Sequence, residues 1–423
     1  MDVTKYEEAI EYISGIPRFA PKTDLENTRI ILESLGNPQN NSKVVHVAGT
    51  NGKGSVSKMI ALMLEKKGYR VGLFTSPHLV RMNERISING RDISDADFVA
   101  LFDKVKTLAD ELVKNETEKN GYKFQHPAYF EFLFVMAAQY FSEKSCDYVV
   151  YETGLGGRLD ATNVTTPEVS VITSIGLDHM QYLGNTIKEI ASEKAGIIKR
   201  EVPIVYNTGD DTADRVIEER ARELNCKAVK ITGYPDDIAD IFGDTQPLYQ
   251  YDNAATAIAA CRLLTGDEDF SEALRAFMWP GRCQWLSDNV LLDGAHNEDA
   301  ALKLTESLKH ICDSRGFDKV SLLFAVSSDK DYESIIKTLT DRLDIEDVYV
   351  TEINSDRRES VSVVMSLFQK YLPAEKHFNV VGSSNMREML KLSRDELSEG
   401  TLLVIVGSLY MAGEILGYEE FFD

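Results

Sequence analysis

A glycine-rich loop that carries a lysine and hydroxyl side chains is the segment of this sequence best suited to hold polyphosphate. It reads Gly49-Thr50-Asn51-Gly52-Lys53-Gly54-Ser55 and lies between a strand predicted at 43–48 and a helix predicted at 55–67. Backbone N–H groups of such a loop and the N-terminus of the next helix surround phosphate oxygens. We expect Lys53 to neutralise the β- and γ-phosphates of a nucleotide and Ser55 to reach a magnesium ion.

The spacing of this loop differs from that of the standard phosphate loop. Only Thr50 and Asn51 separate Gly49 from the Gly52-Lys53 pair, whereas the standard motif has a longer gap. The competing interpretation is a tight turn with a surface lysine. The strand, the lysine, the hydroxyl and the helix together favour phosphate binding over that turn.

Further polar residues stand at or just beyond the ends of predicted strands, where open α/β sheets bind ligands. They are Ser76, Glu152 and His179, and the strands are predicted at 70–74, 147–152 and 169–174. Mg²⁺ prefers oxygen ligands and substrate phosphates, so Glu152 is the strongest candidate ligand and Ser76 the next. His179 is explained equally well as a hydrogen-bonded loop residue. A carboxylate cap of the next turn is the weaker explanation of Glu152, because charge beside an apolar strand is costly without a partner.

The later part of the chain repeats this arrangement. Asp293 and His296 follow a predicted strand and open a helix, and Ser408 follows the last strong strand. Asp293 is explained equally well as an N-terminal helix cap. Arg282 is a fixed cation able to meet phosphate, although an exposed arginine is the commoner state. Composition alone describes Lys194 as a solvated helix lysine.

Strand and helix patterns alternate almost throughout, which predicts an α/β fold with mainly parallel sheets. We expect a large domain with a P-loop-type sheet at 1–282, a linker at 283–289, and a smaller Rossmann-like α/β domain at 290–423. Other predicted elements are a strand at 202–206, helices at 97–114, 127–143 and 253–276, a hairpin at 85–91, an exposed loop at 115–121, and late strands at 290–293, 320–325, 347–351 and 401–406. The hairpin is predicted because Asn89-Gly90 tolerates the positive φ of a tight turn.

Composition bounds the class of partner. The 423 residues include 46 Lys+Arg and 68 Asp+Glu, a net charge of −22, with 43% hydrophobic residues. An acidic chain of this kind argues against a nucleic-acid or anionic-membrane partner, because both require a basic face. No apolar run reaches the length of a membrane span, and residues 1–8 lack a signal-peptide pattern. Five widely spaced cysteines are typical of reduced thiols in a cytoplasmic protein.

Seven motifs, in order, resemble the folylpolyglutamate synthase/dihydrofolate synthase family of the Mur-ligase superfamily. The resemblance spans most of the chain, extends to LGNPQ at 35–39, and includes the unusual spacing of the phosphate loop. The motifs are HVAGTNGKGSV (46–56), TSPHL (75–79), ETGLGGRLDATN (152–163), ITSIGLDHM (172–180), EKAGI (193–197), PGR (280–282) and DGAHN (293–297).

The resemblance implies an ATP-dependent amide ligase that adds L-glutamate to dihydropteroate, to reduced folate or its polyglutamates, or to both. ATP would phosphorylate the acceptor carboxylate, and the amino group of glutamate would attack the acyl phosphate. The ATP- and folate-binding ATPase domain would be 1–282, and the glutamate-binding domain 290–423. The resemblance further implies Mg²⁺, K⁺ as a second cation, small-molecule substrates only, a cytoplasmic location and a monomer.

The resemblance also assigns roles to residues that match the family motifs. Lys53, Glu152, His179 and Lys194 would be catalytic, with Lys194 carbamylated in several members. Ser55, Ser76, Glu152 and His179 would hold the metal. ATP would contact residues 49–55, Asn253, Arg282 and Asp293. The folate side would be lined by Tyr129, Arg158, Leu159, Asp160 and Ala161, and glutamate would be bound by His296 and Ser408.

The chain departs from the family at Ala128. Many relatives carry a threonine at this position in a T-x-F-E type motif, whereas this chain reads Pro127-Ala128-Tyr129-Phe130-Glu131. A hydroxyl that could contact the pterin is therefore missing.

Two other functions remain as alternatives. A Mur-type ligase for another amino acid fits the ATP loop but not the GLGGRLDATN and DGAHN motifs. A non-catalytic ATP-binding regulator would have little need for the full set of Lys53, Glu152, His179 and Arg282.

Overall fold

A computed structural model describes residues 3–17, 24–119, 121–243, 246–372 and 379–418. By its internal contacts the chain divides into two compact units. Unit 1 comprises Met1–Ile241 and Asp252–Phe277, and unit 2 comprises Phe242–Tyr251 and Met278–Asp423. Each unit contains its own sheet, and the two are described separately below.

Unit 1 is built on an eight-stranded sheet with the order β10-β9-β8-β1-β7-β2-β3-β4. The strands from β10 to β2 run parallel, and β3 and β4 add an antiparallel edge. Their bounds are β1 Lys43–Ala48, β2 Val71–Phe74, β3 Ile86–Ile88, β4 Arg91–Asp92, β7 Tyr148–Glu152, β8 Val169–Ile172, β9 Ile204–Tyr206 and β10 Ala228–Lys230. A separate small ribbon pairs β5 Glu118–Lys119 with β6 Tyr122–Lys123.

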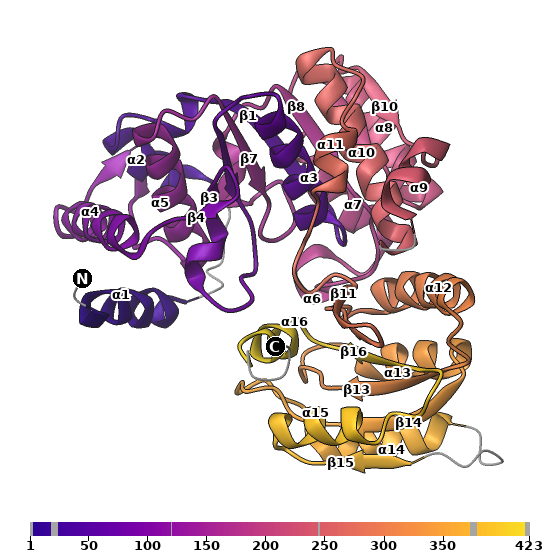
Figure 1. The fold of residues 1–423 in the computed structure, drawn as a ribbon. Coiled ribbons are helices and arrows are strands. Elements are labelled where there is room, and N and C mark those ends of the chain that lie inside the picture. The colour runs from indigo at the N-terminus through magenta and orange to yellow at the C-terminus, as the bar shows by residue number, and fades with distance from the viewer. Residues whose placement is uncertain (1–2, 18–23, 120, 244–245, 373–378, 419–423) are drawn as a thin grey trace. The chain divides into compact units, whose positions relative to one another are not determined.

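The helices of the first part of the chain surround this sheet (Figure 1). They are α1 Val3–Gly15, α2 Glu26–Ser34, α3 Lys53–Lys66, α4 Asp95–Lys114, α5 Tyr129–Glu143, α6 Met180–Leu183, α7 Ile187–Ala195, α8 Asp211–Glu223, α9 Asp236–Phe242, α10 Leu248–Thr265 and α11 Ser271–Arg275, with short 3₁₀ turns η1 Pro38–Asn40, η2 Met82–Arg85 and η3 Ala161–Val164. Helix α3 packs against β1, β2, β7 and α11. Helix α5 is apolar on nearly every side and is almost fully buried, as expected of a helix without a solvent face.

Unit 2 contains a six-stranded sheet with the order β11-β12-β16-β13-β14-β15. Strand β11 is antiparallel to β12, and the other neighbours are parallel. The strands are β11 Gln284–Ser287, β12 Val290–Leu292, β13 Lys319–Phe324, β14 Ile345–Val350, β15 Val380–Gly382 and β16 Thr401–Val406. The helices are α12 Glu298–Arg315, α13 Tyr332–Arg342, α14 Val361–Tyr371, α15 Met386–Asp395 and α16 Leu409–Leu416.

The predicted fold class is confirmed: a mainly parallel α/β sheet and a second, smaller α/β sheet. The hairpin is confirmed too, because Asn89 and Gly90 have φ of 47° and 69° between β3 and β4. The central strands β1, β7 and β8 are buried apart from Lys43 at the start of β1, which is why apolar residues predominate in their sequences.

Three local predictions differ from the structure. The loop predicted at 115–121 contains β5, and the linker predicted at 283–289 contains β11. Both strands form by pairing with a neighbour that the local pattern does not reveal. The helix predicted at 253–276 begins earlier and is broken into α10 and α11, because Gly266 takes a left-handed φ of 72° just after α10.

Candidate active site

The phosphate loop connects β1 to α3, as the sequence predicts, and two of its glycines are required by close packing. A Cβ on Gly49 would overlap Thr173 Oγ1, and a Cβ on Gly52 would lie 2.5 Å from Asn253 Oδ1. Gly52 is also the N-cap of α3 and has a left-handed φ of 84°. The loop therefore presents bare backbone at the N-terminus of a fourteen-residue helix, the arrangement that favours an anion.

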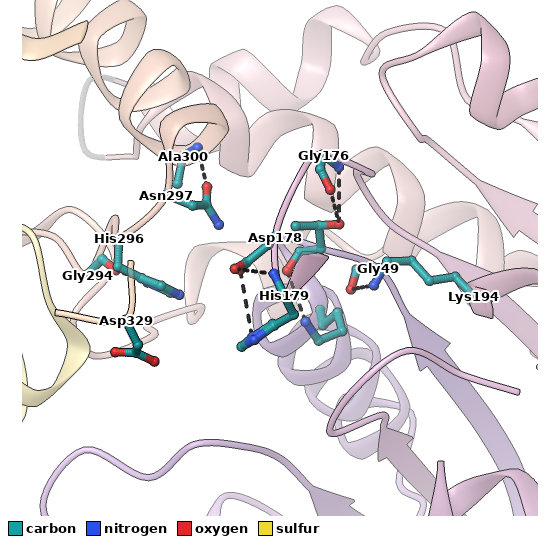
Figure 2. A network of polar contacts seen from close by, with 12 residues as sticks. Gly49, Gly176, Asp178, His179, Lys194, Gly294, His296, Asn297, Ala300 and Asp329 are labelled. Carbon is teal, nitrogen blue, oxygen red and sulfur yellow. Dashed lines mark hydrogen bonds and ion pairs between the residues drawn. The ribbon is translucent and has the colours of Figure 1, made fainter. Parts of the chain in front are cut away.

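Hydrogen bonds tie this loop to the segment that follows β8. Thr50 N donates to Ser174 O at 2.7 Å, and Thr173 Oγ1 donates to Asn51 O at 2.7 Å. Thr50 Oγ1 also lies 3.1 Å from both the nitrogen and the oxygen of Gly176. Figure 2 shows the pair between Gly176 and the loop. These hydrogen bonds fix the shape of the loop against the segment after β8.

Two lysines approach the same loop. Lys53 Nζ donates to Thr50 O at 3.0 Å, so its side chain folds over the loop. Lys194, on α7, is only 3% exposed and donates to Gly49 O at 2.6 Å (Figure 2). Burial and, to a smaller extent, the charge of Lys53 lower the pKa of Lys194 to about 7, against the opposing effect of Asp178 and Asp160. Lys194 is a buried amine at the loop and not the solvated lysine that composition suggests.

Glu152 and Ser76 are brought together by the neighbouring strands β7 and β2. Glu152 ends β7 and is 3% exposed. Its Oε2 accepts a hydrogen bond from Ser76 N at 2.9 Å. Ser55 lies in the first turn of α3 and is 2% exposed. Each of these residues therefore sits at the carboxyl end of the sheet or on the helix that begins there.

His179 stands in the segment after β8 in a left-handed conformation, with φ of 50°. Its backbone N–H donates to Asp178 Oδ1 at 2.8 Å, and its Nε2 lies 3.9 Å from Asp178 Oδ2 (Figure 2). Sequence reasoning did not single out Asp178. Its position beside His179 in the motif ITSIGLDHM was the available signal.

The predicted folate-lining segment is a tightly bonded loop. Asp160 Oδ2 accepts from Gly154 N at 2.9 Å and Leu155 N at 3.0 Å, and Asp160 Oδ1 accepts from both Thr162 N and Thr162 Oγ1. Arg158 is exposed and pairs with Glu193 at 2.7 Å. Leu159 is half-buried and Ala161 is buried. Asp160 therefore shapes this loop from within.

Tyr129 and Ala128 lie at the start of α5. Tyr129 is buried within the core cluster of unit 1, with the Arg85 guanidinium 5.5 Å from its ring centre. Ala128 is the N-cap residue of α5 and forms no side-chain cap, whereas Glu131 Oε2 accepts from Ala128 N at 3.1 Å. A threonine hydroxyl at this position would cap helix α5. Alanine at this position therefore removes a helix cap as well as a group that could contact the pterin.

Asp293, in unit 2, is a structural hub. Its Oδ2 accepts from Tyr249 OH at 2.7 Å and from Cys283 N at 2.8 Å, and its Oδ1 accepts from Ala295 N at 2.8 Å. The carboxylate is 3% exposed and joins Tyr249, β11 and β12. The Tyr249 partnership was missed because Tyr249 is remote in sequence and carries no motif.

The remaining candidates of unit 2 lie at the ends of β12 and β16, which are parallel neighbours. His296 Nδ1 lies 2.7 Å from Gly294 O (Figure 2). Ser408 is the N-cap of α16, where its Oγ accepts from Tyr410 N at 3.1 Å. Arg282 donates to Gly281 O at 3.0 Å, and a Cβ on Gly294 would lie 2.6 Å from Arg282 Nη1. These contacts fix the three side chains at one edge of the second sheet.

The described residues contain no cluster of three or more His, Cys, Asp or Glu side chains arranged to hold a metal. The predicted metal set does not depend on such a cluster, since two of its four members are serines. Within the described ranges, no helix is long and apolar enough to cross a membrane.

Comparison with protein-family models gives two matches. The model described as "Dihydrofolate synthetase, C-terminal domain" matches residues 285–418, and the model described as "Mur ligase middle domain" matches residues 103–255. The first match falls in unit 2, and the second falls almost entirely in unit 1.

Individual relatives match along nearly the whole chain. The dihydrofolate synthase/folylpolyglutamate synthase of Bacillus subtilis is 34% identical and covers 97% of this chain and 98% of its own. The enzyme of the same name from Escherichia coli is 29% identical, with 96% and 94% covered. The structure of Mycobacterium tuberculosis folylpolyglutamate synthase complexed with ADP matches with a TM-score of 0.86 and 27% identity over 99% of this chain and 98% of that one. The chain belongs to the folylpolyglutamate synthase/dihydrofolate synthase family.

Proposed function

We propose that this protein is an ATP-dependent ligase that joins L-glutamate in amide linkage to dihydropteroate, to reduced folate and its polyglutamates, or to both. The observation that carries the proposal is the phosphate loop, where Gly49 and Gly52 leave bare backbone beside Lys53 and the buried Lys194. Relatives of this chain bear the names of both activities, and one similar structure holds ADP.

The chemistry explains why such a loop is needed. A carboxylate does not react with an amine at neutral pH, so ATP transfers its γ-phosphoryl group to an acceptor carboxylate oxygen and leaves as ADP. The amine of glutamate then attacks the acyl phosphate carbon, and phosphate departs as the amide forms. The protein contributes positioning and charge neutralisation to this transfer.

ATP is the nucleotide substrate, and we assign its phosphates to the loop. The N–H groups of residues 52–55 and the ammonium of Lys53 neutralise the transferring phosphoryl group. Asn253 is a further ATP contact, a role supported by the proximity of its amide oxygen to Gly52. Arg282 and Asp293 are the ATP contacts assigned from unit 2.

The donor chemistry fits Mg²⁺. Ser55, Ser76, Glu152 and His179 offer two hydroxyl oxygens, a buried carboxylate and an imidazole, and oxygen donors with substrate phosphates suit this ion. Bound Mg²⁺ would neutralise charge on the phosphates during transfer. His179 is the least typical ligand of the four. Potassium as a second cation rests on the family resemblance, and replacement of K⁺ by Na⁺ in the assay tests it.

Lys194 is the proposed site of carbamylation. An amine with a pKa of about 7 is largely neutral at mildly alkaline pH and therefore able to attack CO₂. The amine nitrogen forms a bond to the carbon of CO₂ as one C=O π bond breaks, one proton leaves the nitrogen, and the neutral amine becomes an anionic carbamate. Growth on ¹³C-bicarbonate, followed by NMR of the purified protein, would reveal a carbamate carbon in the wild type and none in Lys194→Met.

The two organic substrates are assigned to separate units. The folate side is lined by Tyr129 and by the loop Arg158–Ala161, and glutamate is bound by His296 and Ser408. In this assignment, residues 1–282 form the ATP- and folate-binding domain and residues 290–423 the glutamate-binding domain.

We propose a cytoplasmic monomer without nucleic-acid or membrane partners. All five cysteines are free thiols, which is expected in a reducing compartment. Sedimentation of the purified protein at micromolar concentration tests the monomer.

Mass spectrometry of the products tests the proposed reaction. Purified protein is incubated with ATP, Mg²⁺ and L-glutamate, once with dihydropteroate and once with tetrahydrofolate, and the added glutamyl units are counted. Product from both acceptors identifies a bifunctional enzyme, and product from one identifies the branch. A folded, ATP-binding protein that extends neither acceptor refutes the proposal and favours another amino-acid ligase or a nucleotide-binding regulator.

A further inference from the structure

His46 is a fully buried histidine in the middle of β1, three residues before Gly49. Its backbone neighbours are Tyr151 on β7 and Ser170 on β8, so its side chain has no path to solvent. Burial, with a smaller effect of the charge of Lys199, lowers its pKa to about 3. The imidazole is therefore neutral under physiological conditions.

A chain of hydrogen bonds fixes which nitrogen of His46 carries the proton. Thr162 Oγ1 lies 2.5 Å from Asp160 Oδ1, which accepts its single hydroxyl proton. His46 Nε2 lies 2.8 Å from the same Oγ1. Since the hydroxyl proton is already donated to Asp160, His46 must donate from Nε2. Its Nδ1 is then an acceptor, and this nitrogen is buried without a hydrogen-bond partner among the residues that the structure describes.

This chain of bonds ends beside the candidate metal ligand Glu152. Asp160 accepts the backbone N–H groups of Gly154 and Leu155, the second and third residues after Glu152. The path His46–Thr162–Asp160–Gly154 therefore joins the strand that enters the phosphate loop to the loop that begins at Glu152. Both segments have to keep a fixed relation if phosphate and metal are held together.

Stability alone does not account for a histidine at this position. Burying a polar nitrogen without a partner costs free energy, and an apolar side chain of similar volume would avoid that cost. Thr162 would keep its bond to Asp160 without His46. Proteins accept such a loss of stability mainly at functional sites. A destabilising histidine that is hydrogen-bonded to the candidate site is therefore expected to position residues of that site.

We propose that His46 is a positioning residue: by donating to Thr162 Oγ1 it sets the loop 152–162 against the phosphate-loop strand, and so places Glu152 for the metal and Arg158–Ala161 for the acceptor. This inference rests on the proposed function for its substrate assignments. The geometric part, which concerns Mg²⁺ and nucleotide, is independent of ligation.

The test compares His46→Met, which removes the donor, with His46→Gln, whose amide can still donate. The Mg²⁺ dependence of ADP binding is measured by calorimetry, together with the melting temperature and, for an active enzyme, the KM of the acceptor. We expect His46→Met to melt at or above the wild-type temperature while its half-saturating Mg²⁺ concentration rises roughly tenfold or more. We expect His46→Gln to recover most of that loss.

Thr162 provides a second route to the same bond. Thr162→Val removes the bridging hydroxyl and is expected to raise the half-saturating Mg²⁺ concentration, whereas Thr162→Ser is not. The matched control is Ser57→Ala in the same unit. It deletes a buried hydroxyl that, unlike that of Thr162, has no hydrogen-bond partner among the described residues. It should leave both Mg²⁺ and acceptor dependence unchanged.

Two results would overturn the inference. One is wild-type Mg²⁺ dependence and acceptor KM in His46→Met and in Thr162→Val. The other is a fall in melting temperature in His46→Met that Gln does not repair, with unchanged Mg²⁺ dependence. A wild-type protein that ligates nothing refutes the proposed function instead, because the Mg²⁺ titration of ADP binding still reports on His46.

Discussion

Lys194 Nζ donates to the carbonyl oxygen of Gly49 at 2.6 Å, so a buried amine on α7 is anchored to the first residue of the phosphate loop. Burial and the neighbouring charge of Lys53 hold the Lys194 pKa near 7. The candidate site therefore contains two lysines of different character. Lys53 lies over the loop as a cation, and Lys194 titrates beneath it.

The lowered pKa of Lys194 makes stability depend on pH. Between pH 7 and the unfolded value of 10.5, the unfolded chain binds a proton that the folded chain does not. Stability therefore rises with pH in this window, by up to about 1.4 kcal/mol per pH unit, and the cost of the buried charge is complete below pH 7. Lys194→Met removes this contribution.

Urea unfolding followed by circular dichroism from pH 6 to 9 measures the effect. The advantage of Lys194→Met over the wild type should be largest at pH 6 and shrink as pH rises. The exposed Lys188, on the same helix, supplies the control Lys188→Met. Parallel curves for Lys194→Met and the wild type would show that the amine is charged throughout.

Lys53→Ala should abolish ligation and leave the protein folded. It removes the cation over the loop and a partly exposed hydrogen bond to Thr50 O, and such a bond contributes about 1 kcal/mol. We expect the ligation rate to fall roughly 100-fold or more. Lys66→Ala, at the exposed end of the same helix, should retain the wild-type rate. A Lys53→Ala enzyme with normal turnover would contradict the site.

Glu152→Gln should weaken Mg²⁺ dependence and activity together. The amide oxygen can still accept from Ser76 N, so the fold is preserved while the negative charge is lost. The Mg²⁺ concentration for half-maximal rate should rise roughly tenfold or more. Glu168→Gln, an exposed carboxylate before β8, is the control. An unchanged rate and metal response would leave Glu152 a purely structural residue.

Asp293→Asn should destabilise unit 2 by about 1–3 kcal/mol, because one oxygen of a carboxylate that accepts three hydrogen bonds becomes a donor. Both tryptophans, Trp279 and Trp285, lie in this unit, so their fluorescence reports its unfolding in urea. The exposed Asp288, in the turn between β11 and β12, gives the control Asp288→Asn. Equal midpoints for the two variants would disprove the structural role of Asp293.

Gly49→Ala should distort the phosphate loop, because the new Cβ would overlap Thr173 Oγ1. We expect a loss of about 1–3 kcal/mol in stability and a large loss of ADP affinity by calorimetry. Gly15→Ala, at the open end of α1 where no atom lies within 4 Å of a new Cβ, should change neither quantity. Wild-type ADP affinity in Gly49→Ala would show that the loop can accommodate a side chain at this position.

The sequence predicts the elements whose pattern is local. The buried strand β1 and the helix α3 can be predicted because a short apolar run and a 3.6-residue period are patterns among residues that are near one another in the sequence. The edge strands β5 and β11 are not, since two to four residues become a strand only through a partner. The segment Phe242–Tyr251 belongs to unit 2, where Leu248 N donates to Ser307 Oγ. No local signal indicates such a contact.

The candidate site shows the same division. The loop and its lysine are readable because residue type and spacing define their chemistry. The hydrogen bonds of Asp160 within its own loop and the buried state of Lys194 depend on where the chain folds back. Composition therefore described Lys194 as a solvated lysine, and it gave no sign of the bonds that Asp160 makes. The sequence pattern placed His46 in a buried strand and gave it no further role, because its partner Thr162 lies 116 positions away in the sequence.

The most direct test of the proposed reaction follows the oxygen atoms of the acceptor. The acceptor is labelled with ¹⁸O in the carboxylate that becomes the amide, and incubated with ATP, Mg²⁺ and L-glutamate. Mass spectrometry then reads both products. Transfer through an acyl phosphate places one ¹⁸O in the released phosphate for every amide formed and leaves one in the amide. Amide formation with unlabelled phosphate, or ATP hydrolysis without amide, would contradict the proposed mechanism.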